Sequence, residues 1–296
     1  MQRLPEYLEP IKQEKESRQR LPEYLKKPII DTEKTKTVRR ILKTKCLNTV
    51  CEGARCPNKS ECYSRNTATF LIMGNVCTRN CRYCNISCQK PEPLAPLEPQ
   101  HIAKAVKDLG LKYAVITSVT RDDLPDGGAE HFAQCIYEIR KLTPDVRIEI
   151  LTPDFKNDKN ALDTIIKAHP DVFNHNIETV KALFKTARPQ GNYENSLAVL
   201  KYIKENSDIE TKSGMMIGLG ETYEQIKETM EDLHSVNCDI LTVGQYIQPS
   251  KDHLPVAKYY KPEEYTQLRE LATSVGITRH QIGPLVRSSY NAASLA

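Results

Sequence analysis

Short apolar runs alternate with longer amphipathic stretches through most of this 296-residue chain. The apolar runs are rich in β-branched residues, which is typical of strands that a parallel sheet buries on both faces. We predict such strands at 67–74, 113–119, 147–152, 172–177, 211–217 and 240–246. Between them apolar residues recur with helical spacing, and the predicted helices include 129–142, 193–205 and 222–236.

Six successive strand–helix units predict an α/β fold in which helices surround a parallel sheet. We interpret it as a partial (β/α)6 barrel, similar to a TIM barrel, with its site at the carboxyl ends of the strands. Periodicity does not separate a barrel from an open sheet, so a doubly wound sheet remains the alternative. The predicted parts are an N-terminal extension at 1–45, a cysteine-rich segment at 46–66, the barrel at 67–275 and a C-terminal extension at 276–296.

The net charge of +4 is unevenly distributed. Residues 1–45 hold 13 Lys and Arg against 7 Asp and Glu, so the basic excess lies in the N-terminal extension. We interpret this extension as a solvated arm or as a docking segment for an acidic partner or nucleic acid. Its sequence RLPEYL occurs twice, at Arg3–Leu8 and Arg20–Leu25, and we assign no function to the repeat.

The chain contains no apolar run long enough to cross a bilayer, and its first residues lack the apolar segment of a secretory signal. Acidic residues near the start argue against a mitochondrial transit peptide. We therefore expect a soluble cytoplasmic protein that has no membrane or nucleic-acid partner.

Eight of the ten cysteines lie between Cys46 and Cys88. A long chain without an export signal favours metal binding over disulfides. Cys77, Cys81 and Cys84 form a Cys-x3-Cys-x2-Cys pattern on the loop after the first predicted strand. Thiolates are the usual ligands of iron-sulfur clusters, and three of them leave one iron of a four-iron cluster open. A zinc site is the alternative, although zinc sites usually combine paired Cys-x2-Cys motifs and four ligands.

The spacing of these cysteines, the tyrosine before the third and their position after a strand resemble the radical SAM superfamily. The resemblance implies a barrel of the radical SAM type. It also implies a 4Fe-4S cluster whose open iron binds S-adenosylmethionine. An electron from the cluster would cleave this cofactor and release a 5'-deoxyadenosyl radical, which removes hydrogen from an unactivated carbon.

A second run, Cys51, Cys56 and Cys62, has the pattern Cys-x4-Cys-x5-Cys, and the chain ends with an Arg-Ser-Ser-Tyr motif at 287–290. Together they resemble the lipoyl synthases, and this resemblance extends from about Arg20 to Ala293. It implies a second 4Fe-4S cluster, bound by the three cysteines and Ser289. A hydroxyl oxygen is a weak ligand on a thiolate-bound cluster, which suits an iron that must be released.

The family pattern does not include Cys46 and Cys88, which we interpret as additional thiols. Cys135 and Cys238 are expected on amphipathic helical segments, in or near the core.

Contacts with S-adenosylmethionine are expected at two places. The resemblance implies that a turn after the second strand holds the amino group of the cofactor. Beyond the fourth strand, a carboxylate can bind ribose hydroxyls and an arginine can bind the methionine carboxylate. The residues are Asp126, Gly127 and Gly128 in the turn, and Asn176, Glu178 and Arg188 beyond the fourth strand.

The implied reaction inserts two sulfur atoms, at C6 and C8, into an octanoyl chain on a lysine of a carrier protein, with sulfur taken from the second cluster. The implied partners are an octanoylated lipoyl carrier domain or glycine-cleavage H protein, a ferredoxin or flavodoxin as electron donor, and an iron-sulfur cluster carrier for repair. Three alternatives remain at this point. They are another radical SAM enzyme such as a methylthiotransferase or maturase, a ferredoxin-like electron carrier, and a nucleic-acid-binding zinc protein.

Overall fold

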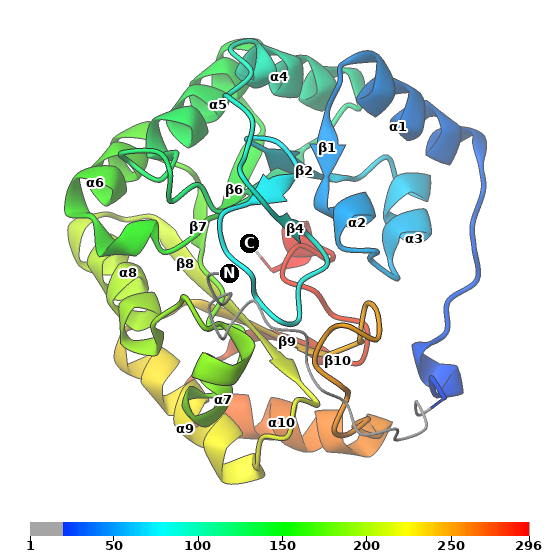
Figure 1. The fold of residues 1–296 in the computed structure, drawn as a ribbon, viewed down its shortest axis with the longest axis vertical. Coiled ribbons are helices and arrows are strands. Elements are labelled where there is room, and N and C mark those ends of the chain that lie inside the picture. The colour runs from blue at the N-terminus through cyan, green and yellow to red at the C-terminus, as the bar shows by residue number, and fades with distance from the viewer. Residues whose placement is uncertain (1–19, 296) are drawn as a thin grey trace, which may run out of the picture.

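Helices form an outer ring around a curved sheet in the computed structural model, which describes residues 20–295 (Figure 1). The first copy of RLPEYL lies outside these residues. Within them the main sheet has eight strands in the order β1-β2-β5-β6-β7-β8-β9-β10. The strands are β1 (Asn48–Thr49), β2 (Thr69–Ile72), β5 (Tyr113–Ser118), β6 (Arg147–Leu151), β7 (Val172–Asn174), β8 (Glu210–Ile217), β9 (Ile240–Gln245) and β10 (Arg279–Gly283).

Strand order distinguishes the two predicted architectures. β1 is antiparallel to β2, and every other neighbouring pair is parallel. From β2 to β10 the spatial order follows the chain order, whereas a doubly wound sheet reverses direction at its switch point. Within residues 20–295 no pairing joins β10 to β1. The partial barrel is therefore confirmed, and the doubly wound alternative is wrong.

The outer helices pack against their neighbours in sequence, for example α4 on α5 and α5 on α6. None of the described helices is both long and apolar enough to cross a membrane. The helices are α1 (Glu33–Thr44), α2 (Val50–Gly53), α3 (Lys59–Ser64), α4 (Glu98–Asp108), α5 (Ala129–Leu142), α6 (Lys159–Ala168), α7 (Lys181–Ala187), α8 (Tyr193–Asn206), α9 (Tyr223–Ser235) and α10 (Pro262–Ser274).

All six predicted strands are present, and α5 begins and ends at the predicted residues. The pattern did not reveal β10, an edge strand whose first three residues are only partly buried, or β1, which is too short to show a period. The expectation for Cys238 was wrong in one respect: this buried residue follows α9 rather than lying on a helix. Cys135 lies on α5 and is buried, as expected.

A buried ion pair crosses the barrel interior. The Nζ atom of Lys212 on β8 lies 3.0 Å from both carboxylate oxygens of Glu149 on β6, and both side chains are 0% exposed. Tyr113 and Asn174 also donate hydrogen bonds to Glu149, at 2.7 and 2.8 Å. Desolvation makes such a pair costly, so it is tolerated only when every charge is compensated.

We expect Lys212→Met to lower the free energy of unfolding by about 3–5 kcal/mol, because it leaves the Glu149 carboxylate buried without a cation. The double variant Lys212→Met, Glu149→Gln removes both charges, and the amide keeps an acceptor oxygen for Asn174 while its N–H can donate to the Tyr113 hydroxyl. It should recover much of the loss in urea unfolding. Equal stability of the single and double variants would contradict this explanation.

Candidate functional site

The loop that contains the first cysteine run lies across the barrel between β2 and α4 (Figure 1). Within it β3 (Val76–Cys77) pairs in parallel with β4 (Ser87–Cys88), so Cys88 is the register partner of Cys77. The backbone N–H groups of Arg79 and Thr120 donate to Cys77 Sγ at 3.4 and 3.3 Å. These two donors orient the thiol of Cys77 at the carboxyl end of β5.

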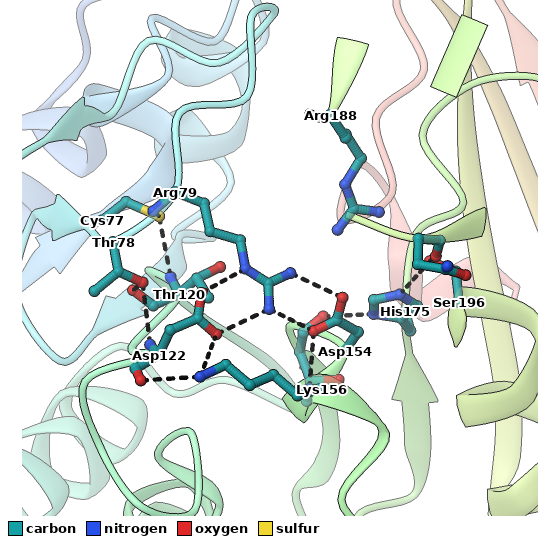
Figure 2. A network of polar contacts seen from close by, with 12 residues as sticks. Cys77, Thr78, Arg79, Thr120, Asp122, Asp154, Lys156, His175, Arg188 and Ser196 are labelled. Atoms are coloured by element: carbon teal, nitrogen blue, oxygen red, sulfur yellow. Dashed lines mark hydrogen bonds and ion pairs between the residues drawn. The ribbon is translucent and has the colours of Figure 1, made fainter. Parts of the chain in front are cut away.

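Arg79 attaches this loop to two strand ends, as Figure 2 shows. Its guanidinium donates to both oxygens of Asp122, beyond β5, at 2.7 and 2.9 Å. It also donates to both oxygens of Asp154, beyond β6, at 2.7 and 2.8 Å. The Arg79 side chain is only 5% exposed. Paired bonds of this kind fix both distance and orientation, so Arg79 helps to fix the position of the cysteine loop, together with backbone bonds such as Thr78 N–H to the Thr120 carbonyl at 3.0 Å.

The same network perturbs the acidity of its members. Burial alone would raise the pKa of Asp154, but the hydrogen bonds and charge of Arg79 outweigh burial and hold that pKa well below its ordinary value. Burial, assisted by the charge of Arg188, lowers the pKa of His175 to about 4. His175 Nδ1 lies 2.9 Å from the Thr152 carbonyl oxygen, and Nε2 lies 3.1 Å from Ser196 Oγ. His175 is therefore a neutral, hydrogen-bonded group near pH 7.

Three predicted cofactor contacts lie together beside the cysteine loop. Asn176 donates to Glu178 Oε1 at 3.4 Å, and Arg188 donates to the Asn176 carbonyl at 3.3 Å. The charges of Arg188 and Glu178 both act on the Cys81 thiol, whose pKa is raised mainly by burial. Tyr83 forms hydrogen bonds with both Cys81 and Glu178. The structure thus brings Asn176, Glu178 and Arg188 next to the first cysteine run.

Among the described residues, the neighbours of Glu178 include buried polar atoms without a hydrogen-bond partner. Burial raises the pKa of Glu178 despite the opposing charge of Arg188. Its φ of 71° lies in the left-handed region, a strain that non-glycine residues show mainly at functional sites. Among the described residues, Asn176 Oδ1 and Arg188 Nε are buried without a hydrogen-bond partner. Buried groups of this kind are usually satisfied, so these atoms fit a polar ligand.

The predicted turn at Asp126–Gly128 has a different environment. The Asp126 carboxylate accepts from the backbone N–H groups of Gly128 and Glu130, at 2.9 and 2.8 Å, and so caps α5. A Cβ on Gly128 would lie 2.3 Å from Met73 Sδ, which explains the glycine. Asp126 thus bonds to the backbone at the start of α5, and Gly128 packs against Met73 at the start of the cysteine loop. A cofactor contact at Asp126, Gly127 and Gly128 stays a prediction.

The second cysteine run lies on α2, α3 and the turn between them. Its three thiols, Cys51, Cys56 and Cys62, interact electrostatically with one another. Burial raises the pKa of Cys51 to about 11, and burial together with the two neighbouring cysteines raises that of Cys62 to about 12. The Cys51 and Cys62 thiols are therefore protonated near pH 7, and they must release their protons when they bind a metal. The Asn85 side chain, next to Cys84, donates to the Gly53 carbonyl at 2.8 Å and so joins the two cysteine runs.

Residues of the Arg-Ser-Ser-Tyr motif lie close to both cysteine runs. Ser289 and Cys62 line one cavity of about 330 Å³. The half-buried Arg287 guanidinium interacts electrostatically with the Cys56 thiol. Ser288 Oγ accepts from Asn176 Nδ2 at 3.2 Å, on the side of the first run. Within the motif, Ser288 therefore contacts Asn176 beside the first run, and Ser289 shares a cavity with Cys62 of the second.

The donor sets fit iron-sulfur clusters better than a single metal ion. Nowhere in residues 20–295 do three His, Cys, Asp or Glu side chains gather closely enough to hold one ion. A zinc ion needs every thiolate about 2.3 Å from one point, whereas a four-iron cluster spreads its ligands over separate irons. This geometry argues against the zinc alternative. Each run provides three mutually close thiols, the donors that such clusters select.

Comparisons with known proteins establish the family. Residues 71–233 match the Radical SAM superfamily. The lipoyl synthase of Caldanaerobacter subterraneus is 52% identical over 85% of this chain and 88% of its own length. That of Rubrobacter xylanophilus is 49% identical over 97% of this chain and 89% of its own. The chain belongs to the lipoyl synthase family. It is a sulfur-transferring radical SAM enzyme that uses S-adenosylmethionine and 4Fe-4S clusters.

Solved structures agree on the fold. The [FeFe]-hydrogenase maturase HydG of Carboxydothermus hydrogenoformans matches with a TM-score of 0.55 at 15% identity, over 73% of this chain and 59% of that one. Streptococcus suis SuiB bound to S-adenosylmethionine matches with a TM-score of 0.53 at 16% identity, over 73% of this chain and 50% of that one. The chain thus spans about half the length of SuiB, and at 16% identity the likeness concerns the fold alone.

Sequence reasoning missed Arg79 and did not assign roles to Asp122 or Asp154. A signal was present, because an arginine inside the cysteine loop and aspartates just beyond two strands are opposite charges at one edge of the barrel. Their pairing nevertheless depends on the distance between segments that are 43 and 75 residues apart.

We expect Arg79→Met to lower 5'-deoxyadenosine formation by about 100-fold, because a shift of the loop by about 1 Å misplaces the reacting groups. Arg79→Lys keeps the charge but not the paired geometry and should give an intermediate rate. Lys156→Met removes an exposed cation near Asp122 and serves as the control. An Arg79→Met rate equal to that of the control would refute the positioning role.

The depressed pKa of His175 makes stability depend on pH. Folded His175 binds a proton only near pH 4, whereas an unfolded histidine does so near 6.5. Because the unfolded state binds more protons in this interval, stability falls as pH drops from about 6.5 to 4, by up to about 3 kcal/mol. Urea unfolding of His175→Gln should show a correspondingly weaker loss over that interval than the parent protein. Parallel pH profiles would count against this assignment.

Proposed function

We propose that this enzyme inserts sulfur at C6 and C8 of an octanoyl chain on a lysine of a lipoyl carrier domain or glycine-cleavage H protein. One observation supports this most strongly: two three-thiol sites lie side by side in one barrel, and the C-terminal motif reaches both. The proximity of the sites suits a reaction in which a substrate radical must meet sulfur before water or another reactant.

We assign the first cluster to Cys77, Cys81 and Cys84, and the second to Cys51, Cys56, Cys62 and Ser289. When bound, the first cluster supplies the electron that cleaves S-adenosylmethionine, and the second supplies sulfur. The protein itself contributes by holding the ligands of the clusters in position. Arg79 helps to hold the first loop in place, and burial raises the pKa values of the Cys62 and Cys84 thiols, so each of these ligands releases a proton when it binds a metal.

Asn176, Glu178 and Arg188 are our proposed contacts for S-adenosylmethionine. The unpartnered Arg188 Nε and Asn176 Oδ1 atoms, in the described part of the chain, provide one donor and one acceptor for a zwitterionic ligand. Glu178 has the raised pKa of a carboxylate in an apolar setting, where a bond to hydroxyl groups would replace lost solvation. The turn at Asp126, Gly127 and Gly128 remains our proposal for the amino group.

The proposed division of the chain follows from these assignments. Residues 67–275 form the barrel, and the segments 46–66 and 276–296 together complete the second site, with 1–45 as an extension. A ferredoxin or flavodoxin is the proposed electron donor, and an iron-sulfur cluster carrier the proposed source of repair. All ten cysteines are free thiols, as expected for a reducing compartment such as the cytoplasm.

Two cysteine variants test the assignment after anaerobic reconstitution, in assays with S-adenosylmethionine, dithionite and an octanoylated lipoyl domain. The parent should bind about eight irons, as two four-iron clusters require. Cys62→Ala should bind about four, still form 5'-deoxyadenosine and yield no sulfur-containing product. Cys84→Ala should also bind about four but form no 5'-deoxyadenosine.

The exposed Cys46 offers a matched control. Cys46→Ala should retain about eight irons and the full yield of product. The assignment fails if Cys62→Ala still makes the lipoyl product, or if Cys84→Ala still cleaves S-adenosylmethionine.

A further inference from the structure

The carboxylate of Glu61 joins three segments that are far apart in the sequence. Glu61 lies on α3, directly before Cys62. The Tyr290 hydroxyl, from the C-terminal motif, donates to Glu61 Oε1 at 3.0 Å. Lys27, from the segment that precedes α1, forms an ion pair with Glu61 Oε2. Arg65, one turn along α3, lies 2.8 Å from Glu61 Oε1.

Lys27 also contacts Tyr290 directly. Its Nζ atom donates to the Tyr290 hydroxyl at 3.4 Å and lies 4.8 Å from the centre of the aromatic ring. The side chains of Lys27 and Glu61 are 20% and 17% exposed. This partial shielding from water makes the Glu61 interactions stronger than those of ordinary surface ion pairs. In Figure 1 the segment that leads into α1 runs along the outside of α3.

Further bonds attach the C-terminal arm, residues 285–291, on both sides of Ser289. Before it, Asn58 Nδ2 donates to the Leu285 carbonyl at 2.7 Å. After it, Arg65 donates to Asn291 Oδ1 at 3.1 Å. The arm thus follows α3 closely.

The Tyr290–Glu61 bond joins the residue next to Ser289 to the residue next to Cys62. Tyr290 directly follows Ser289, and Glu61 directly precedes Cys62. Adjacent Cα atoms are a fixed distance of about 3.8 Å apart, so a bond between these two neighbours also constrains the distance from Ser289 to Cys62. Both of these residues line the same cavity.

We infer that Tyr290 and Glu61 are positioning residues that hold Ser289 in place as a ligand of the second cluster. The inference rests on the proposed ligand role of Ser289. A serine oxygen is a hard donor on a cluster otherwise bound by soft thiolates, so it binds weakly by itself. Its occupancy depends on the arm that presents it, and the Glu61 junction holds that arm against α3.

The test measures the transfer of iron to a ferrous chelator from the anaerobically reconstituted full-length protein. Ser289→Ala identifies the kinetic phase that belongs to the second cluster. Tyr290→Phe keeps the ring but removes the hydroxyl, and it should accelerate the same phase roughly tenfold, in line with the loss of a hydrogen bond to a charged group. Glu61→Gln keeps an acceptor for Tyr290 but loses the cations, and it should accelerate the phase less.

Epistasis separates positioning from general destabilisation. If Tyr290 acts through Ser289, the double variant Ser289→Ala, Tyr290→Phe should release iron no faster than Ser289→Ala alone. Tyr137→Phe, on the half-exposed face of α5, is the control and should match the parent. The midpoint of thermal unfolding should be equal in Tyr290→Phe and this control.

Each adverse outcome has a distinct meaning. If Ser289→Ala accelerates a phase but Tyr290→Phe does not, the positioning role is overturned and the ligand role of Ser289 stands. Additive effects in the double variant also overturn it, because Tyr290 would then act by another route. If Ser289→Ala changes no phase, both the ligand role and the inference built on it are wrong.

Discussion

Arg79 and the two carboxylates that it binds are the interaction on which the first site depends. A loop with three cysteines has no regular backbone pairing sufficient to fix its position, and only the short pair β3 and β4 lies within it. Four hydrogen bonds from one guanidinium to Asp122 and Asp154 add to single backbone bonds that hold the loop, such as Arg82 N–H to the Ala187 carbonyl at 2.9 Å. Because both carboxylates follow barrel strands, the position of the loop is tied to the most rigid part of the fold.

Polar side chains gather at the carboxyl ends of the barrel strands. In the barrel interior, the buried charges are paired with each other. Lys212 and Glu149 neutralise each other within the barrel, with Tyr113 and Asn174 completing the bonds of the carboxylate. The unpartnered atoms of Asn176 and Arg188, by contrast, lie beside the first cysteine run. Polar groups that lack partners are costly when buried, so their location indicates where a ligand is expected.

Two sites share this end of the molecule because short connections hold them together. The bond from Asn85 to Gly53 joins the loops of the two cysteine runs. Ser288 contacts Asn176 beside the first run, whereas Ser289 lines a cavity together with Cys62 of the second run. The C-terminal motif is therefore a structural link between the two cysteine runs, which we propose for cofactor cleavage and sulfur supply. A change in the position of this short segment would affect both.

The sequence alone determined the six central strands, the helix Ala129–Leu142, the two cysteine runs and the likeness to a family, because these depend on local periodicity and spacing. It also placed Asn176, Glu178 and Arg188 together at the carboxyl end of the barrel, since polar residues beyond parallel strands meet at one edge. Tertiary structure decided the order of the strands, the edge strand β10 and the partners of Arg79. It also decided that Asp126 caps a helix and that Glu61 joins both ends of the chain. Those features depend on distances between remote segments, and no local pattern encodes such distances.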